Sequence, residues 1–242
     1  MLKQLLCWIF FLELSMLGAE EILPPVLDYS QVEPSCAAVS SAWRTGQLAF
    51  NGAPEIGTFL VYLKKAYHLD SAVETGTFMG NTTVYLSLLF DAVYTVEIVE
   101  KTYQETANKL KSFPNVRCLL GSSDHVLSRL LPKLVGKRVL FYLDAHWEDY
   151  WPLRDELKEI GKTHYDNCVI MIDDFKVPDR QDILFDKYKE DECSLDYIKN
   201  ELKQVFSDYE IHYLIPVNPQ CRAKFVAVPK KISCDLREAE VL

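Results

Sequence analysis

The chain has 242 residues, of which 49% are apolar, so it can bury one substantial hydrophobic core and we expect a single folded domain. Its 35 acidic residues outnumber its 26 lysines and arginines, which gives a formal net charge of −9. A protein with this charge repels a phosphate backbone, so nucleic acid is not expected as a partner.

Residues 1–19 differ in composition from the rest of the chain. Lys3 precedes an apolar run over residues 5–12, and Ala19 is a small residue after which a leader could be cleaved. This layout is typical of a secretory signal peptide, whereas Glu13 favours the alternative of an apolar first helix packed on the domain. The run is too short for a stable membrane span. The sequence therefore gives no single compartment.

Residues 20–70 are predicted to form an N-terminal extension with two helices, over 36–50 and 55–67, because apolar residues recur there at helical spacing. From residue 71 to residue 230, short apolar runs alternate with longer amphipathic segments, and residues 231–242 form a tail. The expected strands are 72–75, 92–97, 116–120, 138–144, 168–173, 210–215 and 223–228. The expected helices between them are 82–90, 101–112, 124–134, 153–160 and 195–206.

Regular alternation of strands and helices is typical of a parallel sheet with helical crossovers. We predict an α/β fold with a seven-stranded, mostly parallel sheet and helices on both faces. The last two strands leave no room for a helix between them, so they are expected to form an antiparallel hairpin. Ligands bind such sheets at the carboxyl ends of the strands, near the point where the strand order reverses.

A loop with two glycines, residues 74–81 (ETGTFMGN), follows the first expected strand and leads directly into a helix. Gly76 and Gly80 allow the backbone to turn sharply and approach a ligand, at which the first amides of the helix point. Glu97 ends the second strand, 21 residues after Gly76, where a carboxylate can accept hydrogen bonds from both hydroxyls of a ribose. The alternative is a pair of turn glycines and a solvated glutamate.

The loop differs from the dinucleotide-binding fingerprint, because it lacks the third glycine and has Thr77 where a pyrophosphate needs bare backbone. A nicotinamide or flavin cofactor is therefore disfavoured. Glu74, two residues before Gly76, can instead receive the amino group of a zwitterionic ligand, such as the amino-acid end of S-adenosylmethionine.

Residues 73–83 (VETGTFMGNTT), followed by residues 94–98 (YTVEI), resemble the class I S-adenosylmethionine-dependent methyltransferases, and the similarity extends over roughly residues 71–175. The resemblance implies a Rossmann-like methyltransferase fold. It also implies that Glu97 holds the ribose and that Asp144 lies beside the methyl group and contributes to cofactor binding and catalysis. The residues implied around the methionine half of the cofactor are Glu74, Gly76, Thr77 and Gly80. Those implied around the adenine are Leu120, Gly121, Ser122 and Ser123.

Three carboxylates, Asp144, Asp173 and Asp174, end two strands that are expected to be neighbours. Hard oxygen ligands of this kind suit magnesium or calcium, which could orient a substrate hydroxyl and lower its pKa. The alternative is that these carboxylates cap helices or line the pocket without a metal.

The same region is partially similar to the metal-dependent O-methyltransferases of the catechol type. In that family the fourth strand ends in a Leu-Asp-His-Trp run and the fifth in Asp-Asn. Here Ala145 is inserted before His146, Asp174 stands where asparagine is usual, and Glu148 stands where that family has a lysine. His146 is a candidate general base, because an imidazole titrates near neutral pH; the alternative is that it packs or caps the loop.

The function predicted from these features is transfer of the methyl group of S-adenosylmethionine to an oxygen of a small molecule, with magnesium assistance left open. Residues 149–152 and 175–193 are expected to cover the substrate. The alternative is an exported, non-catalytic binding module that keeps the fold. The leader motivates that alternative, because S-adenosylmethionine is supplied in the cytosol.

Overall fold

The computed structural model describes residues 44–53, 55–146, 150–216 and 221–230. The predicted leader (1–19), most of the predicted helix 36–50 and the tail (231–242) lie outside these described residues. Among the helices that are described, none combines the length and the apolar character needed to cross a membrane.

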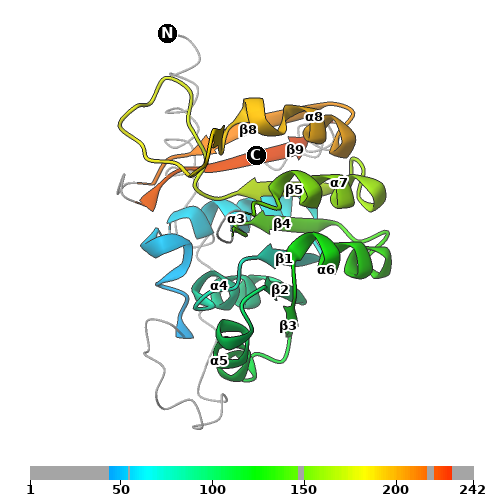
Figure 1. The fold of residues 1–242 in the computed structure, drawn as a ribbon. Helices are drawn as coiled ribbons and strands as arrows, with labels where there is room; N and C mark the ends of the chain where they lie inside the picture. Colours follow the sequence, from blue (N-terminus) through cyan, green and yellow to red (C-terminus); the bar gives the residue numbers. More distant parts are fainter. Residues whose placement is uncertain (1–43, 54, 147–149, 217–220, 231–242) are drawn as a thin grey trace, which may run out of the picture.

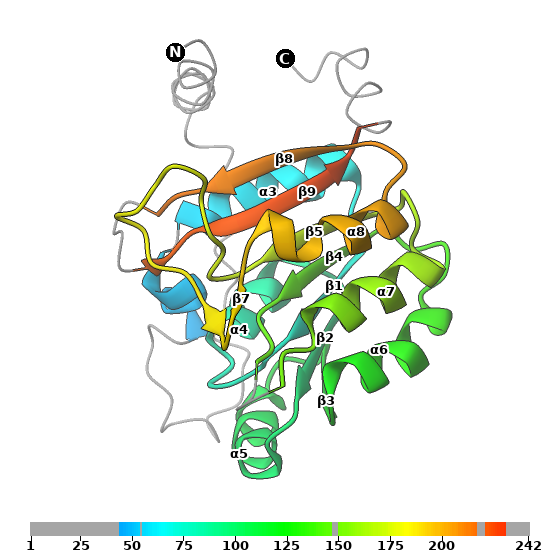
Figure 2. The ribbon, with the colours of Figure 1, turned by 45° about the horizontal axis from the view of Figure 1, so that its top comes forward.

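A seven-stranded sheet forms the centre of the protein (Figure 1). Its strands are β1 (Ser71–Thr75), β2 (Val93–Glu97), β3 (Val116–Leu120), β4 (Val139–Leu143), β5 (Cys168–Ile172), β8 (Tyr209–Leu214) and β9 (Lys224–Pro229). The strand order is β3-β2-β1-β4-β5-β9-β8, and every pairing is parallel except those that β9 makes with β5 and β8. The predicted sheet and its antiparallel C-terminal hairpin are confirmed, and Figure 2 shows β9 between its two partners.

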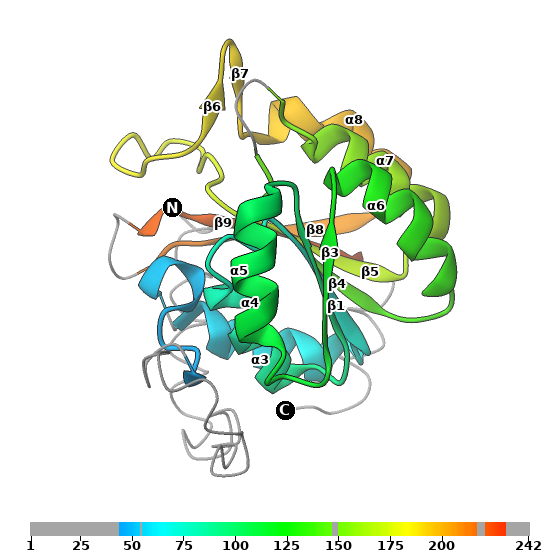
Figure 3. The same ribbon diagram turned by 60° about the horizontal axis from the view of Figure 1, so that its bottom comes forward.

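Helices cover both faces of this sheet (Figure 3). They are α3 (Glu55–Tyr67), α4 (Asn81–Leu89) and α5 (Glu100–Leu110) on one face, and α6 (Ser123–Leu130), α7 (Leu153–Thr163) and α8 (Leu195–Val205) on the other. Because β4 and β5 are buried on both sides, they are apolar throughout instead of alternating with polar residues. In β4, for example, Leu140 belongs to the core beneath α3 and α4, and Phe141 to the core beneath α7 and α8.

The predicted helix 36–50 is wrong at its described end. Within the described residues of this range, Arg44 is helical, residues 45–48 form a turn, and a short 3₁₀ segment follows (Ala49–Gly52). Phe50 has a left-handed φ of 54° there and is fully buried, with its ring 5.2 Å from that of Tyr85 and 5.7 Å from that of Tyr142. Tertiary packing of one aromatic ring therefore overrides the helical periodicity.

Two smaller differences concern helix α6 and the predicted substrate cover. The helix expected over 124–134 changes to a 3₁₀ turn at Leu131–Lys133, because Pro132 has no N–H to continue the α-helical hydrogen bonds. The segment 175–193 contains a short hairpin, β6 (Lys187–Tyr188) and β7 (Asp191–Glu192), which was not predicted.

Candidate active site

The two central strands, β1 and β4, end side by side where the strand order reverses. The N–H of Asp144 donates to the carbonyl oxygen of Thr75 at 3.1 Å, and the N–H of Gly76 donates to that of Val96 at 2.9 Å. Gly76 has a φ of +86°, and a Cβ added to it would lie 2.5 Å from the carbonyl oxygen of Asp144. Glycine is therefore required here for both its φ and its lack of a side chain.

We expect Gly76→Ala to lower the free energy of unfolding by about 2 to 4 kcal/mol, which combines the left-handed strain of an L-residue with a clash against backbone. Gly136→Ala is the matched control, because Gly136 has a φ of +85° but nothing within 4 Å of the added Cβ. The control should lose only about 1 kcal/mol. Urea denaturation of both variants measures the difference, and equal losses would contradict the steric explanation.

Glu97, at the end of β2, accepts a hydrogen bond from the tip of the loop that follows β1 and so holds the loop in place. One of its carboxylate oxygens accepts the N–H of Phe78 at 2.9 Å, and the other accepts the N–H of Val99 at 2.9 Å. Its side chain is buried, while Phe78 and Met79 at the tip are exposed. Each carboxylate oxygen can accept more than one hydrogen bond, so Glu97 can hold the loop and still receive hydroxyl groups of a ligand.

Glu74 lies beneath the loop and is buried. One of its carboxylate oxygens accepts hydrogen bonds from the hydroxyls of Thr83 at 2.5 Å and Thr95 at 2.6 Å, which joins β1, β2 and α4. Burial raises the pKa of Glu74 to about 7. The contact between Glu74 and the amino group of a ligand stays a prediction. Thr77 lies beside it, with its hydroxyl 2.6 Å from that of Thr95, and Gly80 precedes the first turn of α4 with a φ of 75°.

The residues predicted around an adenine follow β3 and lie next to Glu97. The N–H of Gly121 donates to the carbonyl oxygen of Glu97 at 2.9 Å. Ser122 occupies the N-cap position of α6, and its hydroxyl donates to the carboxylate of Asp124. Leu120 and Ile98 are exposed at this edge. An exposed apolar pair beside two polar turns is suited to one face and one edge of a flat heterocycle.

A carboxyl group that sequence reasoning missed, Glu156 in the first turn of α7, is fully buried against the same edge. Burial raises its pKa to about 7, and the hydroxyls of Ser123 and Thr75 lower it by less. Within the described part of the chain, none of these three side chains makes a hydrogen bond of standard geometry. A buried carboxyl group of this kind costs stability when it loses its proton.

We expect Glu156→Gln to stabilise the protein above pH 7 and to have less effect near pH 4. The folded chain binds the proton of Glu156 up to about pH 7 and the unfolded chain only up to its ordinary value of 4.5, so the unfolding free energy falls as the pH rises through this interval. The gain at pH 8 should be roughly 3 kcal/mol.

Thermal unfolding at the two pH values tests this prediction. The control is Glu159→Gln on the same helix, which removes a charge that is paired with Lys162 at the surface. A Glu156→Gln variant whose gain is the same at pH 4 and pH 8 would contradict a raised pKa for Glu156.

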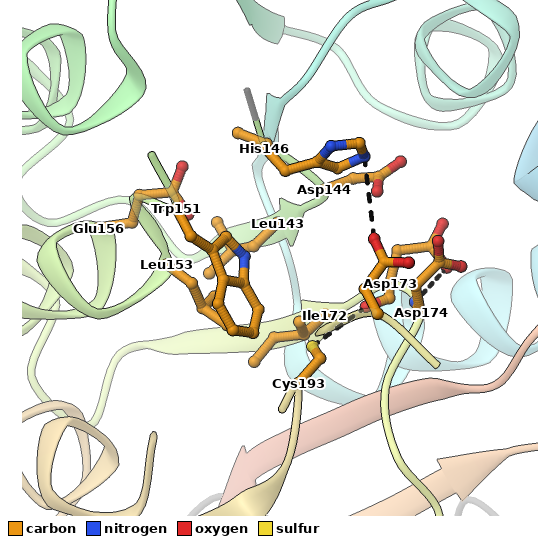
Figure 4. Close-up of a pocket in the computed structure, with 12 residues that line it drawn as sticks. Leu143, Asp144, His146, Trp151, Leu153, Glu156, Ile172, Asp173, Asp174 and Cys193 are labelled. Carbon is orange, nitrogen blue, oxygen red and sulfur yellow. Dashed lines mark hydrogen bonds and ion pairs between the residues drawn. The ribbon is translucent and has the colours of Figure 1, made fainter. Parts of the chain in front are cut away.

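The three carboxylates predicted as metal ligands come together at the ends of β4 and β5 (Figure 4). Asp144 faces the pocket, and burial together with the charges of Asp173 and Asp174 holds its pKa well above its usual value. Asp173 is paired with the fully buried ammonium group of Lys224 and accepts a hydrogen bond from the hydroxyl of Tyr142. The basic partner comes from β9, because Phe225 is in register with Ile172 in the antiparallel β5–β9 pair.

Arg222 neutralises the outer carboxylates of the same group. Its guanidinium donates to Asp174 at 2.5 Å and also to Asp186, which lies in the segment between β5 and β6. His146, half of whose side chain is exposed, lies 3.9 Å from Asp186. His146 is thus close enough to the pocket to act on a substrate, and its role as a base stays a prediction.

An aromatic side of the pocket faces these acids. The ring of Trp151 lies 5.2 Å from that of Tyr188 in the β6–β7 hairpin and stacks at 4.5 Å on Tyr197, while the ring of His146 is 5.7 Å from Tyr188. Figure 4 shows Trp151 and Leu153 across from the carboxylates. The segment 175–193, which was expected to cover the substrate, contributes Asp186 and Cys193 to the lining of the pocket, and its Tyr188 packs against Trp151.

The donor set does not fit a divalent cation. Within the described ranges, no three His, Cys, Asp or Glu side chains are arranged to hold a metal ion. The carboxylates of Asp173 and Asp174 already accept hydrogen bonds or ion pairs from Tyr142, Lys224 and Arg222. The predicted magnesium ligands are assembled, but two of the three are committed to cations of the chain itself.

Comparison with known proteins shows which fold this is. No protein-family model matches the sequence, and no curated protein matches it significantly. Among solved structures, a candidate O-methyltransferase from Klebsiella pneumoniae is 18% identical with a TM-score of 0.53, over 73% of this chain and 80% of that one. The Bacillus cereus O-methyltransferase in complex with S-adenosylhomocysteine is 17% identical with a TM-score of 0.53, over 72% and 80%.

A third structure, the O-methyltransferase TomG of tomaymycin synthesis from Streptomyces achromogenes in complex with S-adenosylmethionine, is 15% identical with a TM-score of 0.53, over 79% of this chain and 90% of that one. This chain has the fold of the class I S-adenosylmethionine-dependent methyltransferases. The resemblance inferred from the loop after β1 is thus confirmed for the fold. The site described above lies at the carboxyl ends of β1, β2 and β4, which is where open α/β sheets bind their ligands.

Proposed function

We propose that this protein transfers the methyl group of S-adenosylmethionine to an oxygen atom of a small molecule. The observation that carries the proposal is the joint between β1, β2 and β4, where Gly76 packs against the backbone of Asp144 and Glu97 fastens the tip of the same loop. A ligand with a ribose at one end and an amino acid at the other can lie along this joint. The methyltransferase fold and its neighbours crystallised with S-adenosylmethionine or its product support the proposal.

The residues at this edge fit such a ligand by their chemistry. The first turn of α4 suits the carboxylate of the amino-acid end, because a helix N-terminus attracts anions. Glu97 suits the ribose hydroxyls, and Leu120 with Ser122 and Ser123 suits the adenine. When bound, S-adenosylmethionine supplies a methyl group activated by its sulfonium charge.

The acceptor lies, in this proposal, between the acids and the aromatic wall. Trp151 and Tyr188 can hold a flat, apolar body, while Asp144 and His146 face its hydroxyl group. Asp144 accepts or shares the hydroxyl proton, so that the acceptor oxygen is more nucleophilic as it approaches the methyl carbon. Orientation in a pocket that excludes water supplies much of the remaining acceleration.

The experiment that tests the function is a calorimetric titration of S-adenosylmethionine into the protein and the variant Glu97→Ala. Loss of hydrogen bonds to a charged acceptor costs about 1.5 to 3 kcal/mol, so the affinity should fall roughly 10- to 100-fold. The matched control is Glu100→Ala, because Glu100 is three residues away and exposed at the start of α5. The control should bind as the unmodified protein does.

Two results would contradict the proposal. One is that Glu97→Ala and Glu100→Ala bind S-adenosylmethionine equally well. The other is that nicotinamide dinucleotides raise the melting temperature of the unmodified protein while S-adenosylmethionine and S-adenosylhomocysteine do not, since a ligand of the folded state stabilises it by mass action.

A further inference from the structure

We propose that Lys224, supported by Arg222, is the resident cation of this active site and takes the place that a divalent metal holds in metal-dependent transferases of this fold. The inference rests on the proposed function for its meaning in catalysis. The observations that support it are the contacts of these two basic side chains.

The first observation is the surroundings of Lys224. Its side chain is fully buried at the start of β9, and its ammonium group is paired with Asp173 and donates to the carbonyl oxygens of Cys221 at 3.2 Å and Arg222 at 3.5 Å. One carboxylate and two carbonyl oxygens account for all three N–H donors of an ammonium group. The cation is therefore enclosed by oxygen atoms, as a bound metal ion is.

The second observation is the charge balance. Lys224 and Arg222 together contribute two positive charges to a group that contains Asp144, Asp173, Asp174 and Asp186. One magnesium ion would contribute the same formal charge. A further ion of charge +2 would have to displace Lys224 from Asp173 or Arg222 from Asp174. Displacement would leave a buried ammonium group without its partner, which is strongly unfavourable.

The third observation concerns the carboxylate oxygens that are still available to bind a metal ion. Both oxygens of Asp173 are engaged, one by Lys224 and the other by the hydroxyl of Tyr142. Arg222 engages one oxygen of Asp174, while the other is buried without a hydrogen-bond partner among the described residues. Magnesium requires an octahedral shell of oxygen ligands and gives up water reluctantly, so Asp144 and a single oxygen of Asp174 form a weak site for it.

The chemical consequence concerns the acceptor. An ammonium group whose donors all point to protein oxygens cannot bind two neighbouring oxygens of a substrate, as a metal ion can. The site therefore selects an acceptor by a single hydroxyl group placed beside Asp144, and it does not select a pair of adjacent hydroxyls that chelate a metal. Removal of divalent ions should leave S-adenosylmethionine binding and methyl transfer unchanged.

The test measures binding of Mn²⁺, used as a probe for divalent ions, by electron paramagnetic resonance of the full-length protein and of Lys224→Ala. The unmodified protein should bind no stoichiometric Mn²⁺, and a chelator should not change its affinity for S-adenosylmethionine. Lys224→Ala exposes the carboxylates to a cation and should gain one Mn²⁺ together with a higher melting temperature in its presence. The double variant Lys224→Ala/Asp173→Asn should lose that gain, which a merely structural role of Lys224 would not produce.

Two results would overturn the inference: one Mn²⁺ bound by the unmodified protein and released by Asp173→Asn, or a folded Lys224→Ala variant that gains no Mn²⁺. If Lys224→Ala does not fold, Mn²⁺ binding by the unmodified protein still tests the inference. Arg222→Ala, whose side chain is partly exposed, then provides the second variant and should gain weaker Mn²⁺ binding through Asp174. Failure to bind S-adenosylmethionine would refute the proposed function separately, because the Mn²⁺ measurement does not depend on it.

Discussion

Replacing Asp144 with asparagine is expected to reduce methyl transfer by about 100-fold or more while making the folded protein more stable. General-base assistance by one side chain contributes roughly 100- to 10,000-fold to a rate, and an amide cannot provide it. The gain in stability has a different cause: burial and the neighbouring Asp173 and Asp174 disfavour the charged form of Asp144, as its raised pKa shows. The substitution removes that unfavourable charge.

The measurement pairs release of S-adenosylhomocysteine, with acceptors that the unmodified protein methylates, with thermal unfolding of the same samples at pH 8. The control is Asp91→Asn, which removes the same charge from an exposed position between α4 and β2. It should change neither quantity. A variant Asp144→Asn that is less stable and equally active would show that Asp144 is a structural residue. Opposite changes in the two quantities are expected where a site holds a charge for function at the expense of stability.

The sequence predicts the strands β4 and β5 well because each is apolar along its whole length. In β4 and β5 all five residues are buried, so a continuous apolar run is sufficient to locate each strand. The loop after β1 is equally easy to predict from the sequence, because Gly76 and Gly80 adopt positive φ angles that other residues rarely adopt. Glu97 stands out by its position at the end of β2.

The acid–base pairing of the site could not be predicted in the same way. Asp173 and Lys224 are 51 residues apart, and they meet only because β9 enters the sheet beside β5 in the antiparallel direction. The available signal was a lysine at the start of a run that is otherwise apolar over residues 223–228. A charged residue in such a run is rarely buried without a partner, so Lys224 indicated an acid nearby without showing which one.

Glu156 illustrates a second kind of limit. Its neighbours on α7 give the helix an ordinary amphipathic pattern, and an acid in a first helical turn is explained by the helix dipole alone. Only the position of α7 against the ends of β1 and α6 makes it a buried carboxyl group beside two hydroxyls. The pattern of a single helix cannot show this, because the contact joins three elements that are distant in sequence.

Lys224→Met should lower the free energy of unfolding by about 3 to 5 kcal/mol at pH 7, the usual cost of leaving one member of a buried ion pair without its partner. The pair with Asp173 is fully buried on both sides, so water cannot replace the missing ammonium group. Adding Asp173→Asn to this variant should recover most of the loss, because the double variant contains no uncompensated buried charge.

The same substitution in an exposed pair separates burial from charge. Lys199→Met removes an ammonium group that is paired with Asp196 on α8, where both side chains are mostly or half exposed, and should cost less than about 1 kcal/mol. Urea denaturation of the unmodified protein, Lys224→Met, Asp173→Asn and their double variant gives a double-mutant cycle, and Lys199→Met is the exposed reference. Should Lys224→Met unfold at the same urea concentration as Lys199→Met, then Asp173 is neutral in the folded protein. A neutral Asp173 has no need of a partner, and Lys224 would not be the cation on which the charge balance of the site depends.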